Sequence, residues 1–161
     1  MTNLLVLGIG NLLMNDDAVG VLAVKHLHKM YGDSENFRIL DGGTLGLDLL
    51  PHIEWSEKLI IIDAIDIGVS AGTVVRIDGE DIDPVFETKL SPHQMGIKDL
   101  LLTADLMGYR PGNIVLFGIQ SKNIQMEMEL SPEVEDNFDK LLYEVEKEIK
   151  LSKIKSEQEL I

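Results

Sequence analysis

Apolar residues in this chain gather in short continuous runs that indicate buried strands. Residues 4–9 form such a run, which ends in a glycine-containing turn and is typical of a strand buried on both faces of a parallel sheet. Further runs predict strands over residues 37–40, 59–62, 73–77 and 113–119. Because the run over residues 59–62 is the most apolar, we expect it at the centre of the sheet, with Asp63 at its carboxyl end.

Apolar residues at helical spacing predict helices between these strands. One helix is expected from Ala18 to Met30, and a short one over residues 45–50 that Pro51 breaks. Another spans Ile97 to Ala104 and ends at Gly108. The last helix has Ser131 as its cap, Pro132 in its first turn and an apolar stripe formed by Val134, Phe138, Leu141, Leu142, Val145 and Ile149.

The alternation of strands and helices predicts an α/β fold, a three-layer α/β/α domain with a five-stranded, mostly parallel sheet. Only about ten residues separate the strands 59–62 and 73–77, whereas a parallel crossover needs a dozen or more. We therefore expect the strand 73–77 to run antiparallel at an edge. Residues 1–150 should form this single domain, and residues 151–161 a frayed polar tail.

Composition narrows the classes of function. The 28 acidic and 14 basic residues leave a net charge of −14, which disfavours binding to nucleic acid. The chain has no cysteine, so disulfides and thiolate chemistry are excluded. Neither a signal peptide nor a membrane-spanning run is visible, and we expect a cytoplasmic monomer without a membrane partner.

The glycines at the end of the first strand invite comparison with a dinucleotide-binding loop. That fingerprint needs a third glycine at the helix entrance, but position 13 is leucine and Gly20 lies inside the predicted helix. Asp16 and Asp17 would also repel a pyrophosphate at this helix. The glycines are better interpreted as turn residues that position the acidic pair, which disfavours a nucleotide-binding protein.

Acidic residues follow three predicted strands at the edge where sites form in such sheets. Asp16 is expected to cap the helix that follows it. Asp17, Asp63 and His93 would together offer two carboxylates and one imidazole, a set that suits nickel or zinc if the three converge. The alternative is that Asp63 caps a loop and His93 a helix.

Four motifs resemble a known family. The segments "GIGNLLMNDDAVG", "ILDGGTLGLDLL", "LIIIDAID" and "SPHQMG" occur in the order and at the intervals of the hydrogenase maturation endopeptidases, and the resemblance covers about residues 3–147. It implies a protease that removes a short carboxyl-terminal extension from the large-subunit precursor of [NiFe] hydrogenases after nickel has been inserted. A nickel-sensing chaperone that binds the precursor without cutting it is the alternative.

The resemblance also implies roles for particular residues. Asp17, Asp63 and His93 would contact nickel that the substrate supplies, and zinc or cadmium could occupy the same position. Asp41, in "DGG", matches a family motif as a further catalytic candidate that either orients the site or holds the two-glycine turn. Cleavage could use a metal-polarised carbonyl, a metal-activated water, or a carboxylate acting as general base.

Overall fold

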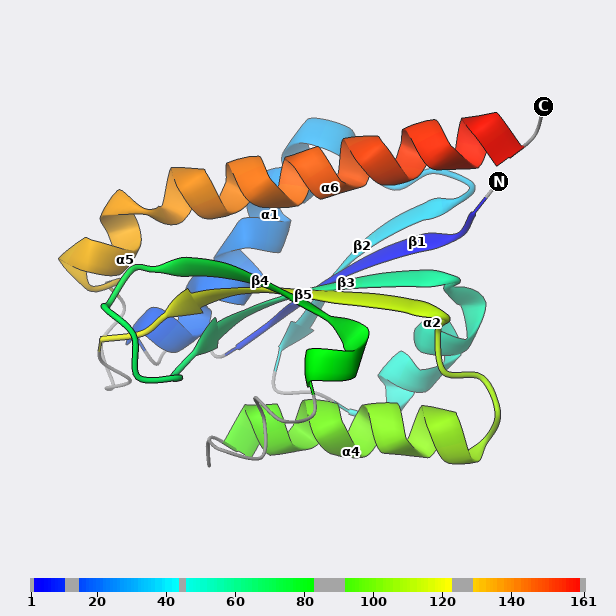
Figure 1. Ribbon diagram of the computed structural model, residues 1–161, viewed down its shortest axis with the longest axis horizontal. Helices are drawn as coiled ribbons and strands as arrows, with labels where there is room; N and C mark the ends of the chain where they lie inside the picture. Colours follow the sequence, from blue (N-terminus) through cyan, green and yellow to red (C-terminus); the bar gives the residue numbers. More distant parts are fainter. Residues whose placement is uncertain (1, 11–14, 44–45, 83–91, 123–128, 160–161) are drawn as a thin grey trace.

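The computed structural model describes residues 2–10, 15–43, 46–82, 92–122 and 129–159, and only the backbone for residues 92–96 and 156–159. Its five strands are β1 (Leu4–Ile9), β2 (Phe37–Gly43), β3 (Lys58–Ile65), β4 (Val74–Asp78) and β5 (Asn113–Gln120). They form one sheet in the order β2-β1-β3-β5-β4 (Figure 1). Pairing is parallel except between β4 and β5, so the predicted antiparallel edge strand is confirmed.

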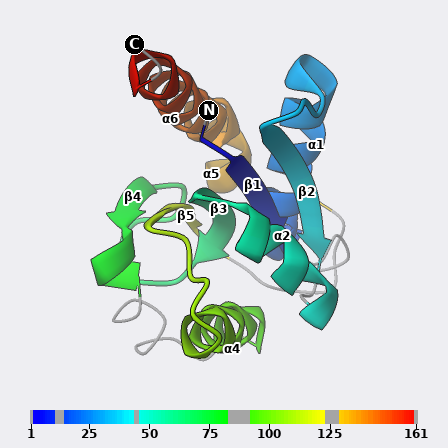
Figure 2. The same cartoon turned by 90° about the vertical axis from the view of Figure 1, so that its right-hand side faces the viewer.

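Helices cover both faces of this sheet, which confirms the predicted three layers. The helical segments are η1 (Asn15–Ala18), α1 (Val19–Tyr31), η2 (Leu47–Leu49), α2 (Leu50–Trp55), α4 (Pro92–Leu106), α5 (Pro132–Asp136) and α6 (Phe138–Glu159). Figure 2 shows α1, α5 and α6 on one face and α2 and α4 on the other. Among the described residues, no helix combines the length and the apolar character needed to cross a membrane.

Alternate residues of β3 enter two separate cores. Ile60, Ile62 and Ala64 pack with residues of α1 and α6, whereas Leu59, Ile61 and Ile65 pack with residues of α2 and α4. Successive side chains of a strand point to opposite faces. Asp63 therefore belongs to the face that α2 and α4 cover.

Several predicted element boundaries were wrong, among them those at Pro51, at Asp63 and at the end of β2. Pro51 lies in the first turn of α2 and so begins a helix rather than breaking one, because proline lacks only an N–H that a first turn leaves unpaired. Asp63 lies within β3, which continues to Ile65 because β5 pairs with it along its whole length. The predicted strand 37–40 is longer as β2, which includes the glycines that follow it.

The end of the chain also differs from its prediction. The last helix is divided at Asn137 into α5 and α6, and α6 includes residues 151–159, which the sequence assigned to a frayed tail. One contact joins the extension to the sheet: the Lys153 ammonium lies 4.5 Å from the ring centre of Phe37 in β2.

Candidate active site

The carboxyl ends of β1 and β3 carry two of the predicted site residues. Asp17 lies in η1, directly after the loop that follows β1, and Asp63 lies near the end of β3. The last pair between β1 and β3 is Gly8 with Ile62, so Asp63 lies just beyond the end of the pairing between these two strands. η1 packs against β3 at this end. Both aspartates are buried, at 6% and 0% exposure respectively.

His93, the third predicted residue, lies in the first turn of α4, which begins at Pro92 and not at Ile97 as predicted. Figure 1 shows this turn at the end of the molecule where β3 and β5 finish. α4 covers the face of the sheet to which Asp63 belongs. The His93 side chain is outside the described residues, so its convergence with Asp17 and Asp63 stays a prediction. Among the side chains that are described, no three acidic or histidine groups are placed to hold a metal.

Two glycines allow α1 to lie directly on the backbone of the sheet. A Cβ atom on Gly20 would lie 2.3 Å from the carbonyl oxygens of both Ile9 and Ile62, and one on Gly8 would lie 2.2 Å from the Gly20 carbonyl oxygen. No side chain fits such a gap. The sequence had given Gly20 no role, although a small residue on the buried face of a helix is the signal for this packing.

The turn after β1 is packed just as closely against the acidic pair. Gly10 has a φ of +142°, and a Cβ atom there would lie 1.7 Å from the Asp17 carbonyl oxygen. Its N–H donates to the Gly43 carbonyl at 3.0 Å. This glycine therefore holds the backbone of Asp17 against the end of β1.

Asp16 has a different role from the one expected. Ala18, not Asp16, occupies the cap position of α1, so the predicted cap was wrong. Asp16 is instead fully buried and accepts hydrogen bonds from the Lys122 N–H at 2.8 Å, the Ser131 N–H at 2.7 Å and the Ser131 hydroxyl at 2.8 Å. Ser131 lies at the cap position of α5, but its hydroxyl donates to Asp16 and makes no cap hydrogen bond to its own helix.

Asn15 reinforces this anchor. It has a φ of +51°, in the left-handed region that asparagine tolerates better than most residues, and its side-chain amide donates to the Glu129 carbonyl. Asn15 and Asp16 thus join η1 to the residues that precede α5. These bonds hold the backbone on the amino-terminal side of Asp17 in place. Sequence reasoning missed Asn15, for which its place before two aspartates was the only signal.

Asp41 is exposed at the end of β2, where it pairs in register with Gly8. Its carboxylate accepts a hydrogen bond from the Gly43 N–H at 2.8 Å, and Gly43 has a φ of +51°. Asp41 therefore holds the two-glycine turn, one of its two expected roles. A catalytic role for it remains a prediction.

Comparison with known proteins identifies the family of this chain. Residues 21–148 match the model of a family described as "Hydrogenase maturation protease". The chain belongs to the hydrogenase maturation protease family. The predicted resemblance is thereby confirmed.

Two curated relatives illustrate the range of this similarity. A hydrogenase 2 maturation protease of Escherichia coli is 36% identical over 143 residues, which are 88% of this chain and 87% of the relative. A hydrogenase expression/formation protein HupD of Rhodobacter capsulatus is 44% identical over 123 residues, which are 75% of this chain but only 58% of the relative. The chain thus spans less than two thirds of the length of some family members.

Solved structures share the fold. The hydrogenase maturating endopeptidase HybD from E. coli superposes with a TM-score of 0.87 at 34% identity, covering 93% of each chain. A [NiFe] hydrogenase maturation protease HybD from Thermococcus kodakarensis has a TM-score of 0.77 at 32% identity, covering 90% of this chain and 97% of the other. The mixed five-stranded sheet with helices on both faces is therefore the fold of these relatives.

Proposed function

We propose that this protein is an endopeptidase that removes the carboxyl-terminal extension of a [NiFe] hydrogenase large-subunit precursor. The observation that carries the proposal is the position of Asp17 and Asp63, two buried carboxylates on contacting elements at one end of the sheet. Membership of the hydrogenase maturation protease family and the match to an E. coli endopeptidase over 93% of the chain supply the reaction class.

The substrate's own nickel is the proposed recognition element. Asp17 and Asp63 supply carboxylate oxygens, and His93, in the first turn of α4, supplies an imidazole nitrogen. Oxygen and nitrogen ligands suit borderline divalent ions such as nickel, zinc or cadmium. Because one chain provides all three residues, we propose that the protein acts as a monomer.

Two routes to peptide hydrolysis are compatible with these residues. In the first, nickel polarises the scissile carbonyl or activates a water molecule. In the second, nickel only positions the precursor while a carboxylate, Asp17 or Asp63, takes a proton from the attacking water as general base. Neither route needs a covalent enzyme nucleophile, in keeping with a chain that lacks cysteine.

The decisive experiment incubates the protein with nickel-loaded and nickel-free precursor and measures the mass of the precursor. We expect shortening of the loaded form alone. Asp63→Asn and Asp17→Asn should slow the cleavage by about 100-fold or more. Asp105→Asn is the matched control, since Asp105 is exposed in the last turn of α4, and it should cleave at the wild-type rate.

The other outcomes are equally informative. If both precursors stay intact while the loaded form binds, the protein is the nickel-sensing chaperone considered above and the protease proposal fails. Cleavage of the nickel-free form at the same rate would contradict nickel recognition. Circular dichroism of each variant separates loss of chemistry from loss of folding.

A further inference from the structure

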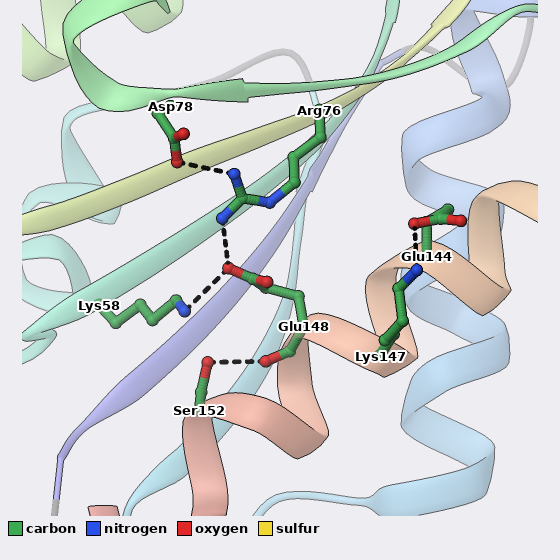
Figure 3. A network of polar contacts seen from close by, with 7 residues as sticks. All are labelled: Lys58, Arg76, Asp78, Glu144, Lys147, Glu148 and Ser152. Atoms are coloured by element: carbon green, nitrogen blue, oxygen red, sulfur yellow. Dashed lines mark hydrogen bonds and ion pairs between the residues drawn. The ribbon is translucent and has the colours of Figure 1, made fainter. Parts of the chain in front are cut away.

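A pocket of about 320 Å³ lies between α6 and the sheet. We call it the α6 pocket. Its charged lining consists of Lys58 from β3, Arg76 from β4, and Glu144, Lys147, Glu148 and Lys155 from α6. Figure 3 shows Lys58 and Arg76 reaching Glu148 from the sheet, while Lys147 lies beside Glu144.

The charge of this lining is opposite to that of the chain. Acidic residues outnumber basic ones two to one in the whole sequence, yet the α6 pocket has four basic and two acidic side chains. Asp78 is not part of the lining, but its carboxylate accepts a hydrogen bond from Arg76 Nη1 at 2.8 Å. Even with Asp78 counted, positive charge is in excess.

The cations at the pocket share too few acceptors. One oxygen of Glu148, Oε1, accepts from both Lys58 Nζ at 3.0 Å and Arg76 Nη2 at 2.8 Å. The Lys58 side chain is only 10% exposed, and this is the one hydrogen bond that its ammonium makes with the described residues. An ammonium group has three donors. A buried ammonium at the pocket wall thus keeps donor capacity for a further acceptor.

A second cation with donors to spare, Lys155, lines the same pocket. Lys147 pairs with Glu144 at 3.1 Å, but Lys155 forms no ion pair with any described side chain. Phe117 and Leu151 add an apolar part to the lining. The volume falls at the lower end of the range for small-molecule sites, which combine an apolar wall with a few polar groups.

We propose that the α6 pocket binds a small oxyanion, a carboxylate or phosphate group on a short organic body. The charged group would accept from Lys58 and Lys155, and the body would lie against Phe117 and Leu151. This site is separate from the candidate active site. Lys58 and Asp63 lie five residues apart on β3, about 17 Å at the strand rise, and on opposite faces of the sheet.

The test titrates the protein with inorganic phosphate and, in a second arm, with glutarate. Calorimetry and the amide chemical shifts in NMR spectra monitor binding in both arms. Saturable binding of either probe, with shifts at Arg76 and Leu151, is the expected result, and the arm that binds identifies the class of anion. Lys155→Glu should weaken binding about tenfold, because it reverses a charge beside the anion. Lys150→Glu, which makes the same change on an exposed residue of α6 outside the pocket, should change it less than about twofold.

The proposal is overturned if neither probe binds, or if the two variants weaken binding equally, which would show a general charge effect. Lys155 is exposed, so its replacement leaves the fold intact. Lys58→Gln, which removes the buried positive charge, is a second variant and should also reduce binding. Its thermal unfolding must be cooperative for the comparison.

Discussion

Asp16 and Ser131, 115 positions apart in the sequence, are joined by two hydrogen bonds that end on different oxygens of the same carboxylate. This connection ties the turn that carries Asp17 to the start of α5. The candidate site therefore depends on a contact between the first and last thirds of the chain.

Replacing Asp16 tests this anchor. Asp16→Asn puts an amide N–H₂ where a carboxylate oxygen now accepts, so it should lower the free energy of unfolding by about 1–3 kcal/mol. Ser131→Ala keeps the backbone donor and should cost only about 1 kcal/mol. Urea unfolding measures both. Equal stability of the wild type and Asp16→Asn would show that the anchor contributes nothing.

Gly20→Ala tests the close packing of α1. The added methyl group meets two backbone oxygens at 2.3 Å, which cannot move without shifting β1 or β3. We expect a loss of about 3 kcal/mol in urea unfolding, and slower precursor cleavage. Gly112→Ala, where the added atom meets nothing within 4 Å, should stay within about 0.5 kcal/mol of wild type. A tolerated Gly20→Ala would contradict the packing described here.

The lowered pKa of Glu148 leads us to expect a loss of stability in acid. Burial alone would raise the pKa of Glu148, but hydrogen bonds from Arg76 and Lys58 and their positive charges outweigh it and lower the pKa below its usual 4.5. The folded protein then binds fewer protons than the unfolded chain, so the stabilisation is present above about pH 4.5 and is lost as the pH falls through the folded pKa. Stability measured from pH 6 to pH 3 should fall more steeply in the wild type than in Glu148→Gln.

The same variant has an effect at neutral pH. Glu148→Gln leaves the buried Lys58 ammonium without its counter-charge and should cost about 3–5 kcal/mol. Glu144→Gln is the control on the same helix, because its pair with Lys147 is partly exposed and should contribute about 0.5 kcal/mol or less. Similar losses in both variants would mean that Glu148 is no more than a surface ion pair.

The raised pKa of Tyr31 leads us to expect a loss of stability at alkaline pH. Burial, a hydrogen bond to Glu146 and the charge of that carboxylate raise the pKa of Tyr31 above 10.0. Its stabilisation is complete below pH 10 and is lost as the pH rises through the folded pKa, because a phenolate would face Glu146. Thermal unfolding between pH 9 and pH 11 should show a smaller loss in Tyr31→Phe than in the wild type. If the wild type and Tyr31→Phe lose stability equally over this pH range, Tyr31 is not the group responsible.

The architecture could be predicted from the sequence because it depends on local patterns. Continuous apolar runs marked the buried strands, and the short connection before β4 excluded a parallel crossover. The position of β5 between β3 and β4 was not predictable, since strand order depends on pairing between distant segments. Element ends failed for a similar reason, and β3 continues past Asp63 because β5 pairs with it there.

The candidate site also has residues that local sequence patterns revealed and residues that only the folded chain revealed. The motifs identified Asp17 and Asp63, and both are found buried on contacting elements. The partners of Asp16 lie more than 100 positions away, so no local pattern could distinguish this anchor from a helix cap. Gly20 was passed over because its importance comes from two strands that meet it only in the folded chain.

The bond between Asp16 and Ser131 has a consequence for biosynthesis. A chain emerging from the ribosome makes β1 and the acidic pair first, but it cannot hold them in place until residue 131 has also left the exit tunnel. A nascent chain that stops after β5 would carry Asp17 without the hydrogen bonds between its neighbour Asp16 and Ser131. The acidic pair therefore reaches its final position only after residue 131 has been synthesised.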